Sequence, residues 1–85
     1  MPTLSMFYGI LIKMYYDDHN PPHIHAMYND DMACFDLEGK MFQGSLPIKQ
    51  RKLVEAWIVI HQDELSADWK LAKEGEPVFK IEPLR

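Results

Sequence analysis

The sequence predicts an α+β domain: an antiparallel sheet of three to four strands, followed by two helices packed on one face. The first half of the chain alternates short runs of β-branched and aromatic residues with turn-forming residues. From Ser45 the pattern changes to longer segments, and no glycine or proline occurs between Pro47 and Gly75. A chain of 85 residues is the length of one domain, so residues 1–85 are expected to fold as a single unit.

Strands are predicted wherever apolar, β-branched and aromatic residues cluster between turn signals. In chain order they are Met6–Tyr15, His23–Tyr28, Met32–Leu37 and Met41–Gly44. The near-continuous apolar character of the first indicates burial on both of its faces, or one face covered by helices and the other by a partner. Asp17–Pro22 interrupts regular structure, because the two prolines stiffen the backbone there. The short turns after Tyr28 and Leu37 predict antiparallel pairing.

The first helix is predicted over Ile48–His61, with Ser45 as its cap and Pro47 in its first turn. Within it, LVEAWIVIH (Leu53–His61) is apolar on almost every side. Two interpretations stay open. The helix could be wedged between the sheet and the second helix, or its excess apolar surface could meet another chain.

The second helix is predicted over Glu64–Glu74, with Asp63 as N-cap and Gly75 as C-cap. The segment Val78–Ile81 is rich enough in apolar residues to add a short strand.

Composition limits the function classes. The chain carries 9 basic and 13 acidic residues, a net charge of −4, which disfavours direct DNA binding and leaves RNA open. Cys34 is the single cysteine and is expected to lie in the sheet as a small apolar residue. With no disulfide framework, signal peptide or apolar run long enough to span a membrane, a cytoplasmic location is expected.

The candidate site is the stretch YDDHNPPHIHAMY, which holds three of the four histidines. His23 and His25 point to the same face if His23 opens a strand, because strand side chains alternate. The proline turn could fold His19 back toward them. Three imidazoles with Asp17 or Asp18 nearby would suit a divalent metal such as zinc. The same residues could perform acid–base chemistry, since histidine titrates near neutral pH.

The three histidines could instead have a structural role, because histidines beside Pro-Pro often use one ring nitrogen to bind a backbone carbonyl of the loop. His61, near the end of the first helix, could support the site, or its imidazolium could interact with the helix C-terminus.

The opening half of the chain resembles a widespread group of small bacterial proteins of unknown function. Their shared Asp-His-x-Pro-Pro-His-x-His-Ala pattern runs here from Asp18 to Ala26, with Ile24 in place of the common Phe. The later half is also similar, with a Trp-containing helix and an EL...W...A..G pattern ending at Gly75. The resemblance implies that Asp18, His19, His23 and His25 form a site, although the family has no established activity. Its members are often encoded beside a second small protein, as in toxin–antitoxin modules.

Two functions follow as hypotheses. The protein could be a binding module that pairs with the small protein encoded nearby, or with a second copy of itself, through Leu53–His61 or a sheet edge. Alternatively it could be a small hydrolase or ribonuclease that uses His19, His23 and His25, with Lys13 or the Lys49–Lys52 cluster to steady a phosphate. We expect the binding module.

Overall fold

The computed structural model describes residues 2–14, 16 and 20–85. Five strands come first, and two helices follow. The strands are β1 (Thr3–Phe7), β2 (Ile10–Lys13), β3 (His23–Tyr28), β4 (Asp31–Asp36) and β5 (Met41–Gly44). The helices are α1 (Ile48–Ile60) and α2 (Gln62–Lys73). The predicted α+β class is therefore confirmed, with one strand more than the upper limit expected.

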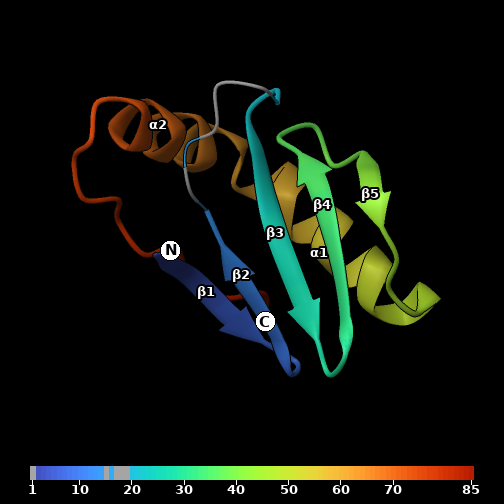
Figure 1. The fold of residues 1–85 in the computed structure, drawn as a ribbon. Coiled ribbons are helices and arrows are strands. Elements are labelled where there is room, and N and C mark those ends of the chain that lie inside the picture. Colours follow the sequence, from blue (N-terminus) through green and yellow to red (C-terminus); the bar gives the residue numbers. More distant parts are fainter. Residues whose placement is uncertain (1, 15, 17–19) are drawn as a thin grey trace.

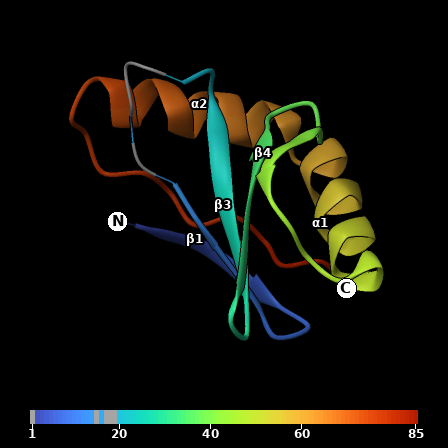
Figure 2. The same ribbon diagram turned by 45° about the vertical axis from the view of Figure 1, so that its right-hand side comes forward.

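The strands form one antiparallel sheet in the order β1-β2-β3-β4-β5, so each strand pairs with its neighbour in sequence. Figures 1 and 2 place both helices on the same side of this sheet. We call the side under the helices the inner face and the opposite side the outer face. No helix in the described part of the chain is long and apolar enough to cross a membrane.

The predicted strand Met6–Tyr15 is wrong as a single element, because it folds into the hairpin β1–β2. Tyr8 and Gly9 form its turn, with φ angles of 49° and 77°. Two positive φ values in succession match the right-handed twist of a hairpin, and glycine adopts the second without steric cost. The apolar run is continuous because its residues serve two faces: Phe7 and Ile10 lie in the core, whereas Met6 and Leu11 pair on the outer face.

The core lies between the inner face and the helices. Ile24, Ala26 and Phe35 on the central strands are fully buried, as are Trp57 and Leu65 on the helices. The Trp57 ring packs on Phe7 with centroids 5.4 Å apart. Its indole N–H donates a 2.8 Å hydrogen bond to the Glu82 carbonyl. Trp57 therefore joins the sheet, α1 and the C-terminal tail.

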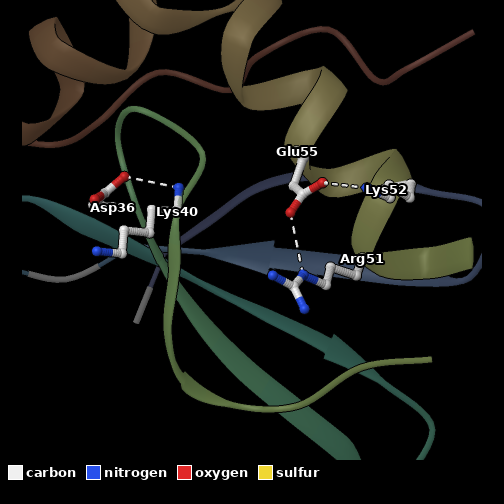
Figure 3. Close-up of polar contacts among 5 residues, drawn as sticks. All are labelled: Asp36, Lys40, Arg51, Lys52 and Glu55. Carbon is white, nitrogen blue, oxygen red and sulfur yellow. Dashed lines mark hydrogen bonds and ion pairs between the residues drawn. The ribbon is translucent and has the colours of Figure 1, made fainter. Parts of the chain in front are cut away.

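Helix α1 begins where predicted, but its cap differs. The N-cap residue is Pro47, which makes no side-chain capping bond, and Ser45 lies two residues earlier. On the first turns of the helix, Glu55 forms ion pairs with Arg51 at 3.2 Å and Lys52 at 3.8 Å (Figure 3). Such exposed pairs at i, i+3 and i, i+4 contribute only a few tenths of a kcal/mol each.

Helix α2 begins two residues earlier than predicted, at Gln62, so Asp63 lies inside its first turn instead of capping it. The C-cap residue is Glu74 and not the predicted Gly75, which follows it and ends the helix. Gly75 has φ of 74°, its N–H bonds the Ala72 carbonyl, and the Glu76 N–H bonds the Leu71 carbonyl. This pair of bonds is the Schellman arrangement, which glycine favours because the left-handed conformation carries no Cβ penalty.

The C-terminal tail is ordered without forming the predicted strand Val78–Ile81. It passes behind β1 and β2 in Figure 1. A single strand-like bond, from the Ile81 N–H to the Leu4 carbonyl at 2.8 Å, ties it to β1. Asp68 of α2 accepts a second bond, from the Phe79 N–H at 2.9 Å. One ladder bond is too few for a strand, yet enough to seat Ile81 in the core.

Candidate functional site

Strand β3 begins at His23, so His23 and His25 lie on the same side of it, as predicted from strand alternation. Their ring centroids are 5.1 Å apart and their planes are inclined by 52°. The two residues are only 2% and 8% exposed. The two imidazoles therefore lie close together, as a shared site requires, but both are buried.

The ring of His23 is held from several directions. Its Nδ1 lies 2.7 Å from the Pro21 carbonyl oxygen, so the N–H at this position donates to the loop before β3. In the neutral ring this bond places the proton on Nδ1 and the lone pair on Nε2. The ring also contacts Trp69 of α2 and Phe42 of β5, with centroids at 5.5 and 5.8 Å. The proline turn thus fixes the tautomer, and two aromatic rings fix the position.

Cys34 is the neighbour of His25 that the sequence analysis missed. The register of the β3–β4 hairpin sets the two residues directly opposite each other, and Cys34 Sγ lies 3.6 Å from His25 Nδ1. Cys34 is buried, as expected, but it is a hydrogen-bonding partner and not merely a small apolar residue. The signal was present in the sequence. If Asn29 and Asp30 form a two-residue turn, residues whose numbers sum to 59 pair across it.

Burial raises the pKa of the Cys34 thiol, because the thiolate would lose its hydration. At neutral pH the sulfur therefore keeps its proton and can donate it to His25 Nδ1. A neutral thiol is a poor nucleophile, since the thiolate is the reactive form. The pair is suited to fixing the imidazole more than to attacking a substrate.

The remaining predicted site residues are not gathered around this pair in the described structure. His19 and Asp18 lie outside the described residues. His61 stands at the junction of α1 and α2, where its ring packs on Trp57 and its Nδ1 lies 2.5 Å from a Glu64 carboxylate oxygen. Within the described part of the chain, no three His, Cys, Asp or Glu side chains are grouped so that they could hold a metal ion. The role of His61 as a supporting residue stays a prediction.

The basic residues that were predicted to bind a phosphate lie on two different elements. Lys13 is paired with His25 in the β2–β3 register, so it lies on the adjacent strand beside the candidate site. Arg51 and Lys52 lie on α1, and both are ion-paired with Glu55 (Figure 3). Of these cations, Lys13 is the one whose backbone position adjoins the histidines.

A surface groove of about 500 Å³ adjoins the proline turn. Its lining residues come from that turn, from the β4–β5 connection and from the start of α2. They are Pro21, Pro22, Asp36, Leu37, Glu38, Gln62, Asp63 and Ser66. Asp36 is committed to the local turn, because its Oδ1 accepts the Glu38 N–H and the Lys40 N–H, each at 2.9 Å. Figure 3 shows the bond from Lys40. Neither His23 nor His25 lines the groove, so it is not an entrance to the imidazoles.

The outer face next to the histidines is apolar and exposed. Met6 pairs with Leu11, Leu11 with Met27, and Met27 with Met32, which places one side chain from each of β1 to β4 in a line across the sheet. We call these four residues the methionine row. Met6 is 64% exposed and Met32 39%, while Leu11 and Met27 are half-buried. Figure 1 shows this side of the sheet facing the viewer, with both helices behind it.

A comparison with protein families places the chain. The model of a family described as a domain of unknown function (DUF4160) matches residues 9–70. Neither the curated proteins nor the solved structures give a significant match. The matched segment contains His23, His25 and Cys34, and it confirms the resemblance seen in the sequence to a family without an assigned function. Since the match spans more than half of the chain, this protein belongs to the DUF4160 family.

Proposed function

We propose that the protein works by binding a partner protein through the outer face of its sheet. The observation that carries the proposal is the methionine row, a contiguous apolar line across four strands on the side away from the helices. Apolar surface that is gathered in one place and exposed is typical of interaction sites. Methionine suits such a surface, because its flexible thioether side chain adapts to the shape of a partner.

The partner we propose is the small protein encoded nearby, in a two-gene module of the toxin–antitoxin type acting in the cytoplasm. The resemblance to families with this gene arrangement supports that choice. A second copy of the chain is the alternative partner, because a row that is apolar along its whole length can also pair with itself. The proposal assigns neither the toxic nor the protective role.

Helix α1 offers a second apolar surface against which the proposal can be tested. Val54, Trp57 and Ile58 of the segment Leu53–His61 are buried, whereas Val59 and Ile60 are exposed. The segment is therefore both a core helix and a helix with apolar residues facing solvent. Because Val59 and Ile60 are two residues on one turn, whereas the methionine row crosses four strands, we assign the interface to the methionine row.

The test is co-purification with the neighbouring small protein, followed by measurement of mass in solution. Met6→Glu combined with Met32→Glu should abolish the complex, whereas Val59→Glu combined with Ile60→Glu should leave it intact. The reverse pattern would move the interface to α1. If the two proteins remain separate and the protein alone is a monomer, partner binding through either surface is refuted.

A second candidate function is a hydrolase or ribonuclease at the histidines, with or without a bound metal such as zinc. The observation that favours it is the fixed tautomer of His23, because a backbone-held Nδ1–H is how many catalytic or metal-binding histidines are oriented. The small exposed fraction of both rings weighs against it. His23→Gln and His25→Gln should abolish RNA cleavage by chelator-free protein if this function is present. Cleavage that persists in both variants, or a lack of cleavage by the wild type, would exclude it.

A further inference from the structure

A second groove, unrelated to the histidines, runs between β1 and the C-terminal tail. It has a volume of about 490 Å³ and is lined by β1 residues from Thr3 to Met6, by tail residues from Lys80 to Pro83, and by Glu64 of α2. A smaller pocket of about 130 Å³ adjoins it and shares Glu64, Lys80 and Ile81 with it. Because three residues line both, the two pockets are adjacent, and we treat them as the wide part and the narrow part of one candidate site.

Each part of this site contains a buried polar atom with no hydrogen-bond partner in the described structure. In the wide part it is the hydroxyl oxygen of Ser5, and in the narrow part it is Oδ2 of Asp68. Asp68 is only 2% exposed, and its other oxygen, Oδ1, already accepts the Phe79 N–H. Leaving a buried acceptor unsatisfied costs about 1–3 kcal/mol, and more if the group is charged. Two such atoms in one site indicate that it is built to receive a polar ligand.

The other charged groups in the site are already engaged or sit at its rim. Glu64 accepts from His61, and Glu82 is ion-paired with Arg85 at 2.8 Å. Lys80 is exposed. In the narrow part, Asp68 Oδ2 is thus the buried acceptor without a partner in the described structure, and Glu64 adds a second carboxylate beside it.

We propose that this site binds a cationic N–H donor, the ammonium or guanidinium group of a lysine or arginine residue, with Asp68 Oδ2 as its acceptor. The narrow part has room for about four water molecules of ~30 Å³ each, which suits one such head group. The Ser5 hydroxyl lies in the wide part, where it can bond the peptide group that carries the side chain. A divalent metal fits less well, because such ions take several oxygen ligands and the described residues group no three together.

The electrostatics of Asp68 agree with a cationic ligand. Burial raises the pKa of its carboxyl, the negative charge of Glu64 raises it further, and the Phe79 N–H acts in the opposite direction. Lys80, which lines the same pocket, is the nearby positive charge. A bound cation would favour the ionised form, so binding should release a proton and the affinity should rise with pH as Asp68 titrates.

Titration of the full-length protein with argininamide, followed by backbone amide NMR, tests the proposal. We expect saturable shifts at the Phe79 and Ser5 amides, and no such shifts with tetramethylammonium, which has the charge but no N–H donor. Asp68→Asn should weaken binding about tenfold or more, because it removes the charge while its amide oxygen can still accept from Phe79. Glu74→Gln, which removes an exposed carboxylate outside the site, should leave the affinity unchanged.

A second probe separates the two sources of the cation. If the site takes a residue of a polypeptide, a blocked Ala-Arg-Ala peptide should bind more tightly than argininamide, and Ser5→Ala should reduce that advantage. Equal affinities would assign the site to a free small cation. The proposal is overturned if argininamide gives no saturable shifts, if tetramethylammonium gives the same shifts, or if Asp68→Asn binds as the wild type does.

Discussion

The inner and outer faces of the sheet both carry apolar side chains, but these side chains differ in how far they are buried. On the inner face, Ile24, Ala26 and Phe35 are completely buried under the helices. On the outer face, burial changes from one cross-strand row to the next. His25 and Cys34 are buried, whereas in the adjacent row Met6 is 64% exposed and Met32 39%. The inner face is uniform because its side chains pack together in the core.

The difference in burial between the two faces points to the outer face as the one that could contact other molecules. Exposed apolar side chains add little to the stability of a small domain, but a contiguous group of them favours association with other molecules. The inner face accounts for the stability of the fold, and the buried pair His25–Cys34 stiffens one end of the outer face. The methionine row is the part of the outer face that the fold itself does not explain.

The largest effect that would test the comparison comes from the inner face. Trp57→Ala should cost about 3–5 kcal/mol, because it removes a fully buried ring and its hydrogen bond to the tail. Urea unfolding monitored by circular dichroism measures the loss. The control is Val59→Ala on the exposed side of the same helix, which should change the free energy of unfolding by less than about 0.5 kcal/mol. Similar losses for both variants would contradict an inner face that dominates stability.

An intermediate effect should come from the buried end of the outer face. His25→Ala should cost about 1–3 kcal/mol, because it removes the packing on His23 and the partner of the Cys34 thiol. Gln43→Ala is the matched control, since Gln43 lies in the same cross-strand row but is exposed. If His25→Ala is as mild as this control, the histidine does not stiffen the sheet and is available for another role.

A smaller, pH-dependent effect concerns Asp68, the buried carboxyl on the helix side. Because its folded-state pKa is raised, ionisation costs the folded state stability as the pH rises through the unfolded and then the folded pKa. Asp68→Asn escapes this cost. The stability advantage of the variant over the wild type should therefore grow between acidic and neutral pH. Thermal unfolding of both proteins across that pH range measures this difference in stability. A difference that does not vary with pH would contradict a raised pKa of Asp68 in the folded state.

The smallest effect on stability is expected from the methionine row, where the effect on binding should be largest. Met6→Lys should change the free energy of unfolding by less than about 0.5 kcal/mol, because most of this side chain is in contact with water. Met32 is only 39% exposed, so Met32→Lys should change it somewhat more, by less than about 1 kcal/mol. Chemical unfolding measures the effect of each variant on stability, and co-purification of the same samples measures its effect on partner binding. A substantial loss of stability would mean that the row packs against the protein itself and is not an interface.

The element types could be predicted from the sequence, because local patterns decide them. The turns after Tyr28 and Leu37, the break at Ser45 and the glycine after α2 each have a local cause that can be read in order along the chain. The hairpin at Tyr8–Gly9 was missed, because one glycine within an apolar run of ten residues is a weak turn signal. Ser45 and Asp63 were misplaced as caps, since a helix boundary depends on packing as well as on its nearest polar residue.

The candidate site could be predicted only in part. The shared side of His23 and His25 follows from strand alternation, which the sequence contains. Their burial does not, because it depends on Trp69 and Phe42, which come from distant positions to cover the ring of His23. The Cys34 contact lies between these cases, since the hairpin register determines it once the turn is known.

The two edge strands of the sheet, β1 and β5, differ in whether another segment of the chain bonds to them. This difference affects how copies of the chain could assemble. The tail closes the edge at β1 through the bond from Ile81 to Leu4, while β5 ends the sheet as a strand of four residues. A sheet with two open edges can add strands at both ends and grow into a fibre. We expect the tail to hinder strand pairing at β1, so that edge-to-edge pairing through β5 alone would stop at two molecules.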